Sequence, residues 1–144
     1  MGVTRILAVD YGLRRIGMAV SDELGMTAQG LPTVRIRGMM GGVAAVAEVA
    51  SRQSAGEVVV GLPLNMDGTR GPMAEAAEAF AQALREATGL PVLCRDERLT
   101  SVSARRAMQE MGVKTRGRKG TVDRIAATLL LDSYLRAQQG QPDG

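Results

Sequence analysis

The chain has 144 residues, 45% of them hydrophobic and 23% charged, so it can bury one core but is too short for two ordinary domains. It contains no histidine, which excludes Ser-His-Asp or Cys-His catalysis and histidine-ligated zinc, and leaves carboxylates, which prefer hard cations such as Mg²⁺ or Mn²⁺, to support any chemistry. The net charge of +3 favours a polyanionic partner, and the lack of a signal sequence or of an apolar run of about 18 residues predicts a cytoplasmic protein with no membrane association.

Three short apolar segments at the start of the chain predict β-strands. They cover residues 4–9, 16–20 and 32–36, and the third alternates apolar residues with others. The first segment ends at Asp10 and Gly12, where we expect a turn. We predict that the three strands form an antiparallel meander.

Strands and helices alternate through the rest of the chain. Apolar spacing and turn residues predict strands at 57–61 and 92–95 and helices over 43–53, from Pro72 to Gly89, from Thr100 or Ser101 to Gly112, and over 122–137. We therefore expect one α/β domain over residues 1–137, with a mixed five-stranded sheet of three antiparallel strands followed by parallel strands, flanked by helices. Residues 138–144 are expected to form a flexible C-terminal tail. The single cysteine, Cys94, is expected to be a small core residue.

Two acidic residues stand at the ends of predicted strands. Asp10 ends the first strand, where α/β sheets present ligand-binding groups, although an aspartate two residues before a glycine is also common in turns. Glu97 follows the strand at 92–95 within a run of four charged residues that could equally be a solvated loop. The spacing alone does not distinguish Glu97 from Asp96.

Asp123 is a third candidate because of its place on a helix. It shares one helical face with Ala126, Ala127 and Leu130, so its carboxylate is expected on the core side. The alternative is an aspartate in the first turn that is stabilised by the helix dipole. Asp132 is rotated by about 180° from Asp123 and is expected to face solvent, so we exclude it from the site.

Basic residues close to these carboxylates in the sequence predict contacts with nucleic-acid phosphates. Some flank the carboxylates directly, and others belong to a glycine-containing segment that precedes the helix of Asp123. Ordinary surface ion pairs and a solvated loop are the respective alternatives. The predicted nucleic-acid-binding residues are Arg14, Arg15, Arg98, Lys114, Arg116, Arg118 and Lys119.

Aromatic residues make up only 2% of the chain, which limits how bases could be read. Phe80 is expected in a helix core, which leaves Tyr11 and Tyr134 as candidates for stacking on bases. Tyr11 could stack near the site or be an ordinary strand-end residue. We expect recognition through the backbone and shape of the nucleic acid rather than through its sequence.

Segments spread over nearly the whole chain resemble the YqgF family of Holliday-junction-resolvase-like proteins, which are described as pre-16S ribosomal RNA nucleases. They include DYG at 10–12, RIGMA at 15–19, VGLP at 60–63, DERLT at 96–100 and DRIAA at 123–127. The resemblance implies a ribonuclease H-like fold. It also implies that Asp10, Glu97 and Asp123 are both the catalytic residues and the ligands of Mg²⁺ or Mn²⁺, and it selects Glu97 over Asp96.

By resemblance, the chain is expected to be a metal-dependent nuclease that hydrolyses phosphodiester bonds. Its expected substrate is structured RNA, as in the processing of pre-16S ribosomal RNA during ribosome biogenesis, with branched DNA such as a Holliday junction as a second candidate. Asp10 would bridge two cations about 3.5–4 Å apart, with Glu97 and Asp123 on either side. The sequence leaves open which metal is used and whether the chain is a monomer or a homodimer.

Two other functions stay open at this stage. One is a non-catalytic RNA-binding factor in ribosome assembly that keeps the same fold. The other is ATP-dependent phosphoryl transfer, because the turn at residues 10–12 also resembles the phosphate loop of actin-like ATPases. Those enzymes clamp a nucleotide between duplicated domains, and a chain of this length holds one domain, so this is the weaker alternative.

Replacing Arg118 and Lys119 with glutamine tests the basic segment. If both side chains contact phosphates, the slope of log binding constant against log salt concentration should become shallower by about 0.7 to 0.9 for each lost contact. The measurement is nucleic-acid binding over a salt series, and an unchanged slope would remove this segment from the interface.

Overall fold

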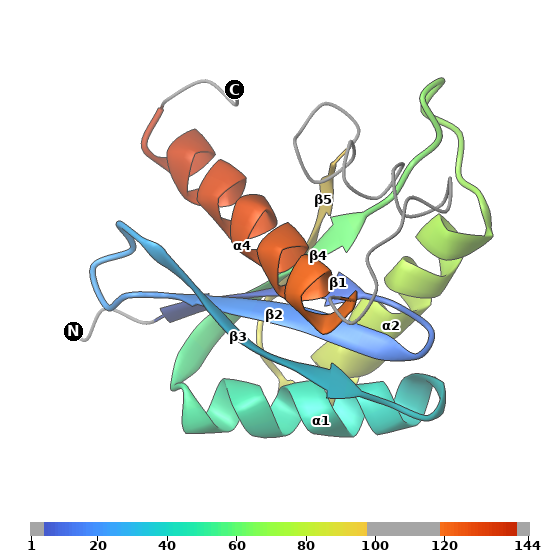
Figure 1. Cartoon of the computed structure of the whole chain (residues 1–144), viewed down its shortest axis with the longest axis horizontal. Helices are drawn as coiled ribbons and strands as arrows, with labels where there is room; N and C mark the ends of the chain where they lie inside the picture. The colour runs from blue at the N-terminus through green and yellow to red at the C-terminus, as the bar shows by residue number, and fades with distance from the viewer. Residues whose placement is uncertain (1–4, 98–118, 141–144) are drawn as a thin grey trace.

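Five strands form the centre of the structure, and helices cover both faces of the sheet (Figure 1). The computed structural model describes residues 5–97 and 119–140. The strands are β1 (Arg5–Tyr11), β2 (Arg15–Ser21), β3 (Ala28–Arg35), β4 (Ala55–Leu62) and β5 (Val92–Asp96). The helices are α1 (Gly38–Arg52), α2 (Pro72–Thr88) and α4 (Lys119–Gln138).

The sheet is mixed, and its strand order is β3-β2-β1-β4-β5. β2 pairs antiparallel with both β1 and β3, whereas β4 runs parallel to β1 and β5 runs parallel to β4. The predicted meander followed by parallel strands is therefore confirmed. Because β1, β4 and β5 run in the same direction, their carboxyl ends meet at one edge of the sheet.

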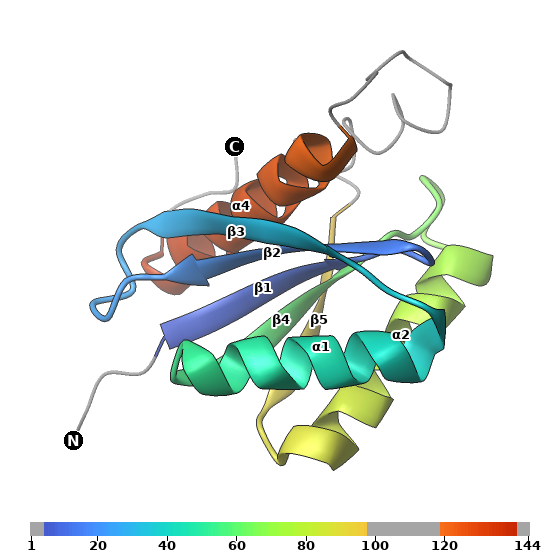
Figure 2. The same ribbon diagram turned by 60° about the horizontal axis from the view of Figure 1, so that its bottom comes forward.

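Burial on both faces explains the unbroken apolar run in β1. Figure 2 shows α1 and α2 on one side of the sheet and α4 on the other. Leu7 and Val9 belong to the cluster under α1 and α2, while Ile6 and Ala8 belong to the cluster under α4. A strand covered on both faces needs apolar residues at every position, not only at alternate ones.

Small residues let α4 approach the sheet closely. Ala126 and Ala127 of the helix lie in one buried cluster with Ala8 of β1 and Ala19 of β2. Leu130, one turn after Ala126, is also fully buried in this cluster. The helical face predicted from the sequence is therefore the face that packs on the sheet.

β3 and α1 begin well before the residues at which the sequence predicts them to start. β3 starts at Ala28, because Ala28 pairs with Ser21 of β2 even though this end of the strand is exposed and lacks apolar alternation. α1 starts at Gly38 rather than at residue 43, so its first turn contains glycines that usually weaken a helix. A Cβ on Gly42 would lie 3.0 Å from Cδ1 of Ile16, so glycine lets α1 pack tightly on the sheet. The helix predicted up to Gly112 lies outside the described residues.

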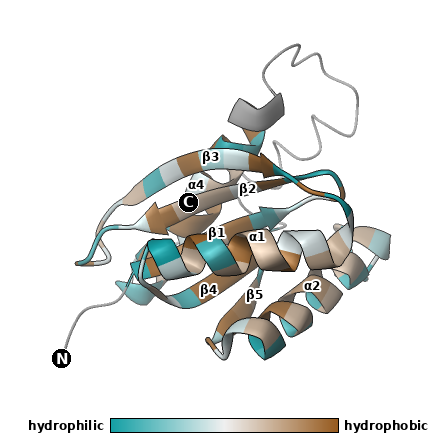
Figure 3. Ribbon diagram, turned by 90° about the horizontal axis from the view of Figure 1, so that it is seen from below, coloured by the Kyte–Doolittle hydropathy of each residue, from teal (hydrophilic) through white to brown (hydrophobic). Residues whose placement is uncertain are grey.

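In Figure 3 the central strands are mainly hydrophobic, and the hydrophilic bands of α1 lie towards its C-terminal end. The buried residues of α1 include Val43, Val46 and Val49, as expected of a helix with one face on a core. Cys94 lies half-buried in β5 against the cluster under α1 and α2, and burial raises the pKa of its thiol. Within the described ranges, the helices lack the length and apolar character that a membrane span requires.

Replacing Phe80 with alanine tests the packing between α2 and the sheet. The ring is fully buried and stacks on Tyr11 with 4.4 Å between ring centroids, so its loss should lower the free energy of unfolding by about 3–5 kcal/mol. Urea unfolding followed by circular dichroism measures this, with Leu24→Ala as the control, because Leu24 is 75% exposed. A loss below about 1 kcal/mol would contradict the placement of the ring.

Candidate active site

Asp10 lies between two glycines on neighbouring strands. On one side, Asp10 of β1 pairs directly with Gly17 of β2. On the other side, Val9 pairs with Val60 of β4, so Gly61 continues the register beside Asp10. Alternation from Ile6 and Ala8 places the Asp10 side chain on the face covered by α4.

Asp123 of α4 lies directly over Gly17. A Cβ on Gly17 would stand 2.1 Å from the carbonyl oxygen of Asp123 and 3.0 Å from its Cβ, so only glycine admits the helix here. α4 begins at Lys119, three residues before the predicted start, and the first turn of the helix contains no acidic residue. The helix-dipole interpretation of Asp123, which required a place in the first turn, is therefore wrong.

Glu97 lies over the other glycine. A Cβ on Gly61 would stand 2.6 Å from Oε2 of Glu97, so the carboxylate occupies the space that a side chain at position 61 would fill. The backbone N–H of Glu97 donates to the carbonyl oxygen of Leu62 at 3.4 Å. Asp96 is exposed, whereas Glu97 is buried, so the backbone after β5 turns the second of the two acidic side chains towards α4.

All three predicted carboxylates are buried on the same face of the sheet. Asp10, Glu97 and Asp123 are 7%, 2% and 8% exposed. Acidic residues are rarely this buried unless they are paired or hold a cation. Asp132, by contrast, is half-exposed and pairs with Arg136 at 3.1 Å, which confirms that it faces away from the site.

The three carboxylates are not gathered around one point. Nε of Arg15 donates to Oδ2 of Asp123 at 2.7 Å, so this carboxylate is turned towards β2. Arg15 lies two residues before Gly17 on the same face of the strand, which brings its guanidinium within reach. Among residues 5–97 and 119–140, no three acidic, histidine or cysteine side chains are arranged to hold a metal ion. The predicted three-carboxylate metal set is therefore brought to one face but not assembled.

A cavity of about 300 Å³ opens beside Asp10 and Asp123. It combines two carboxylates with two guanidinium groups, so it can accept both a cation and the phosphate oxygens of a ligand. Its lining residues are Asp10, Tyr11, Gly12, Leu13, Arg14, Arg15, Met73 and Asp123.

The structure describes only part of the predicted basic surface. Arg14 is exposed and Arg15 is half-buried, and both line this cavity. Lys119 is the first residue of α4. The remaining predicted contacts, Arg98, Lys114, Arg116 and Arg118, lie outside the described residues.

Arg35 is a basic residue beside the site that was not predicted from the sequence. It is the direct partner of Arg15 across β2 and β3. The predicted meander could have identified it. If the strand at 32–36 pairs antiparallel with the strand that follows Arg14, Arg35 lies beside the start of that strand.

The two candidate stacking residues are engaged within the fold. Tyr11 is 4% exposed and its ring packs on Phe80, so its proposed stacking on a base is wrong. The hydroxyl of Tyr134 donates to Glu57 at 2.6 Å, and the guanidinium carbon of Arg95 lies 5.9 Å from its ring centroid. Desolvation and then the Glu57 carboxylate raise the pKa of Tyr134 to about 12. These contacts agree with recognition that does not depend on aromatic stacking.

The fold is that of RuvC-like, ribonuclease H-like proteins. One similar structure is Thermus thermophilus RuvC in complex with a Holliday junction substrate, with a TM-score of 0.57 and 18% identity over 97% of this chain and 98% of that chain. Another is the fowlpox virus resolvase in complex with Holliday junction DNA, with a TM-score of 0.54 and 16% identity over 93% of this chain and 98% of that one. The predicted ribonuclease H-like fold is confirmed.

A family model and relatives of higher sequence identity show to which family the chain belongs. Residues 4–137 match the family model described as RuvX, Holliday junction resolvase, and the chain belongs to this family, predicted above under the name YqgF. The "Putative pre-16S rRNA nuclease" of Moorella thermoacetica is 48% identical over 131 residues, which cover 91% of this chain and 94% of that protein. The protein of the same name from Myxococcus xanthus is 44% identical over 135 residues, which cover 94% of this chain and 89% of that protein.

Alanine at the two glycines tests how the site is held. Gly17→Ala should lower the free energy of unfolding by about 1–3 kcal/mol, because the new methyl group meets the backbone of α4. Gly61→Ala should cost less, because the methyl group meets side-chain atoms of Glu97 and Leu130 and no backbone atom. Chemical unfolding of the two variants provides the comparison.

Gly41→Ala is the matched control for this pair. Gly41 lies in α1, and a Cβ there would meet nothing within 4 Å, so alanine should be neutral or slightly stabilising. If Gly17→Ala were as stable as Gly41→Ala, the close approach of α4 to β2 would be refuted.

Proposed function

We propose that this chain is a metal-dependent nuclease that hydrolyses phosphodiester bonds in structured RNA. The observation that supports this best is the burial of Asp10, Glu97 and Asp123 on one face, at the edge where the parallel strands end. The names of its relatives support pre-16S ribosomal RNA as the substrate, in ribosome biogenesis. The family description makes branched DNA the second candidate.

The carboxylates fit a hard divalent cation in their donor chemistry and in their surroundings. Oxygen donors suit Mg²⁺ or Mn²⁺, and Gly17 and Gly61 leave room for carboxylates on both sides of Asp10. Asp10, Glu97 and Asp123 would hold the ions, and Arg15 occupies only the Oδ2 oxygen of Asp123. Bound ions of this kind activate a water molecule and stabilise the leaving oxygen of an in-line displacement.

The position of Asp10 favours it as the shared ligand. It stands in the middle of the row, with Asp123 over Gly17 on one side and Glu97 over Gly61 on the other. A carboxylate in the middle would be the one best placed to contact ions on both sides.

Arg14 and Arg15 would hold the phosphate that is cut. Both line the cavity that contains Asp10 and Asp123, and guanidinium groups bind phosphate oxygens through paired N–H donors. Their charge offsets the repulsion between a phosphate and the carboxylates. Binding of the substrate and correct placement of its phosphate would therefore depend on the same two side chains.

Asp10→Asn tests the nuclease proposal. The variant keeps the shape of the side chain but removes its charge, so cleavage in Mg²⁺ or Mn²⁺ should fall by at least about 100-fold. The assay compares a precursor of 16S ribosomal RNA with a four-way DNA junction, and unfolding curves verify that the variant folds. Asp132→Asn is the control, because it changes the charge equally at a surface position.

The same assay separates the alternatives. Full activity in Asp10→Asn would refute the catalytic role of this carboxylate. If the unchanged protein bound the precursor RNA but cut neither substrate in either metal, the non-catalytic RNA-binding factor would be the better description.

A further inference from the structure

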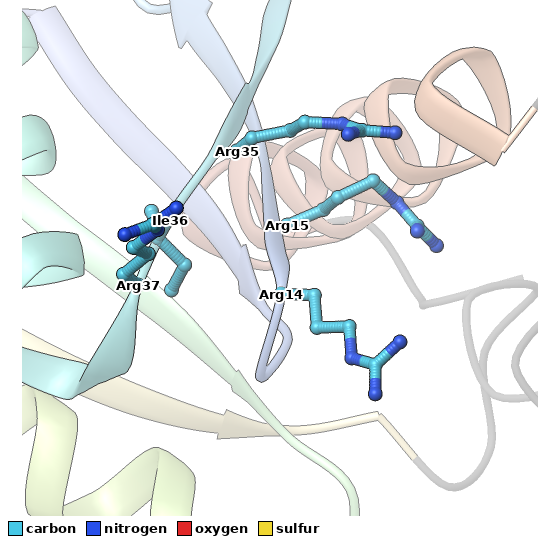
Figure 4. A pocket seen from close by; sticks show the side chains of 5 residues that line it. All are labelled: Arg14, Arg15, Arg35, Ile36 and Arg37. Carbon is cyan, nitrogen blue, oxygen red and sulfur yellow. The ribbon is translucent and has the colours of Figure 1, made fainter.

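A second cavity, of about 600 Å³, lies at the end of β2 and β3, and arginines dominate its lining. Figure 4 shows the side chains that border it. The lining residues are Arg14, Arg15, Arg35, Ile36 and Arg37. Arg14 and Arg15 also line the cavity of Asp10 and Asp123, so the two cavities adjoin along these two residues.

The strand register forces like charges together in this cavity. Arg15 and Arg35 are direct partners across β2 and β3, an arrangement in which like charges destabilise a sheet. The backbone N–H of Ile36 donates to the carbonyl oxygen of Arg14 at 3.0 Å, which keeps Arg14 beside the same pair. The fold therefore places three arginines side by side at this end of the sheet.

Little negative charge within the described part of the chain compensates these cations. Arg15 pairs with Asp123, but no described carboxylate pairs with Arg14, Arg35 or Arg37. Arg14 and Arg35 are also exposed, so their donors are accessible to a ligand. A cluster of this kind is stabilised by a polyanion.

The side chains share a direction that suits an extended ligand. In Figure 4, Arg14, Arg15 and Arg35 extend to the same side of the sheet, while Arg37 turns the other way. Among the described residues that line the cavity, Ile36 alone is apolar, and none has an aromatic ring or an acceptor side chain that could recognise a base. The lining therefore suits phosphate oxygens, through paired N–H donors, far better than a nucleobase.

We propose that this cavity binds a second backbone phosphate of the nucleic acid, next to the phosphate that lies over Asp10, with Arg35 as its principal ligand. The proposal rests on the proposed function for the identity of the substrate. A strand that crosses both cavities passes from the carboxylates to Arg35 along Arg14 and Arg15. Contacts of this type set the position of the strand without reading its sequence.

Arg35→Gln is the variant that isolates this cavity. Arg15 is unsuitable because its loss also releases Asp123, and Arg14 borders both cavities. Arg35 lies exposed at the end of an edge strand opposite a like charge, so glutamine should leave the free energy of unfolding unchanged or raise it. Unfolding curves check this before binding is measured.

The experiment measures binding of a fluorescein-labelled RNA hairpin in EDTA, by anisotropy, over a salt series. For Arg35→Gln, the slope of log binding constant against log salt should become shallower by about 0.7 to 0.9, with several-fold weaker binding at low salt. Arg35→Lys keeps the charge but loses the paired donors, so the slope should be retained while binding weakens.

Arg52→Gln is the control with the same change of charge. Arg52 is exposed at the far end of α1, which has 15 residues and is therefore about 20 Å long, and it pairs with Glu48. For Arg52→Gln, the slope of log binding constant against log salt should equal that of the unchanged protein. If Arg35→Gln also gave that slope, the second phosphate site would be refuted.

Because EDTA removes divalent ions, the binding experiment does not depend on cleavage, and its result is independent of the nuclease proposal. A shallower slope for Arg35→Gln supports the phosphate site even if the unchanged protein cuts nothing in Mg²⁺ or Mn²⁺. An unchanged slope overturns the site even if the protein cuts RNA efficiently.

Discussion

The close contact of α4 with the sheet is the constraint on which the site depends. Helix backbone can lie directly on β2 only because Gly17 has no side chain, and this contact brings Asp123 from the end of the chain to the level of Asp10. On the opposite side of Asp10, Gly61 likewise leaves space that the carboxylate of Glu97 occupies. Two missing side chains thus allow three distant segments to place acidic groups on one face.

Burying these groups creates an electrostatic problem that the fold solves with arginine. A buried carboxylate without compensation is strongly unfavourable, and Arg15 provides an ion pair for Asp123. The same residue stands opposite Arg35, so one side chain connects a region of negative charge with a region of positive charge. Negative and positive groups therefore lie next to each other at this end of the sheet.

Patterns that depend on burial could be predicted from the sequence. The apolar run of β1 predicted a buried strand that ends near Asp10, and the helical face of Ala126, Ala127 and Leu130 correctly predicted that Asp123 lies on the core side. The choice of Glu97 over Asp96 needed the resemblance to a family, because adjacent residues in a charged run give no periodic pattern.

Features set by tertiary pairing could not be predicted in the same way. The exposed start of β3 and the glycine-rich start of α1 form because neighbouring elements pair with them, against their local preferences. Arg15 as the partner of Asp123 depends on a contact across 108 positions of sequence. Arg35 is also defined by register, because it is unremarkable until β3 is placed beside β2.

The exposed position of β3 has a consequence for self-association. An edge strand offers unpaired backbone groups to which a strand of another molecule can add, and this route leads to aggregation. Pro32 interrupts the row of N–H donors on β3. The positive charge of Arg35 also repels the same edge strand of a second molecule. The outer border of the sheet is therefore protected against growth into a larger sheet while it stays open to solvent.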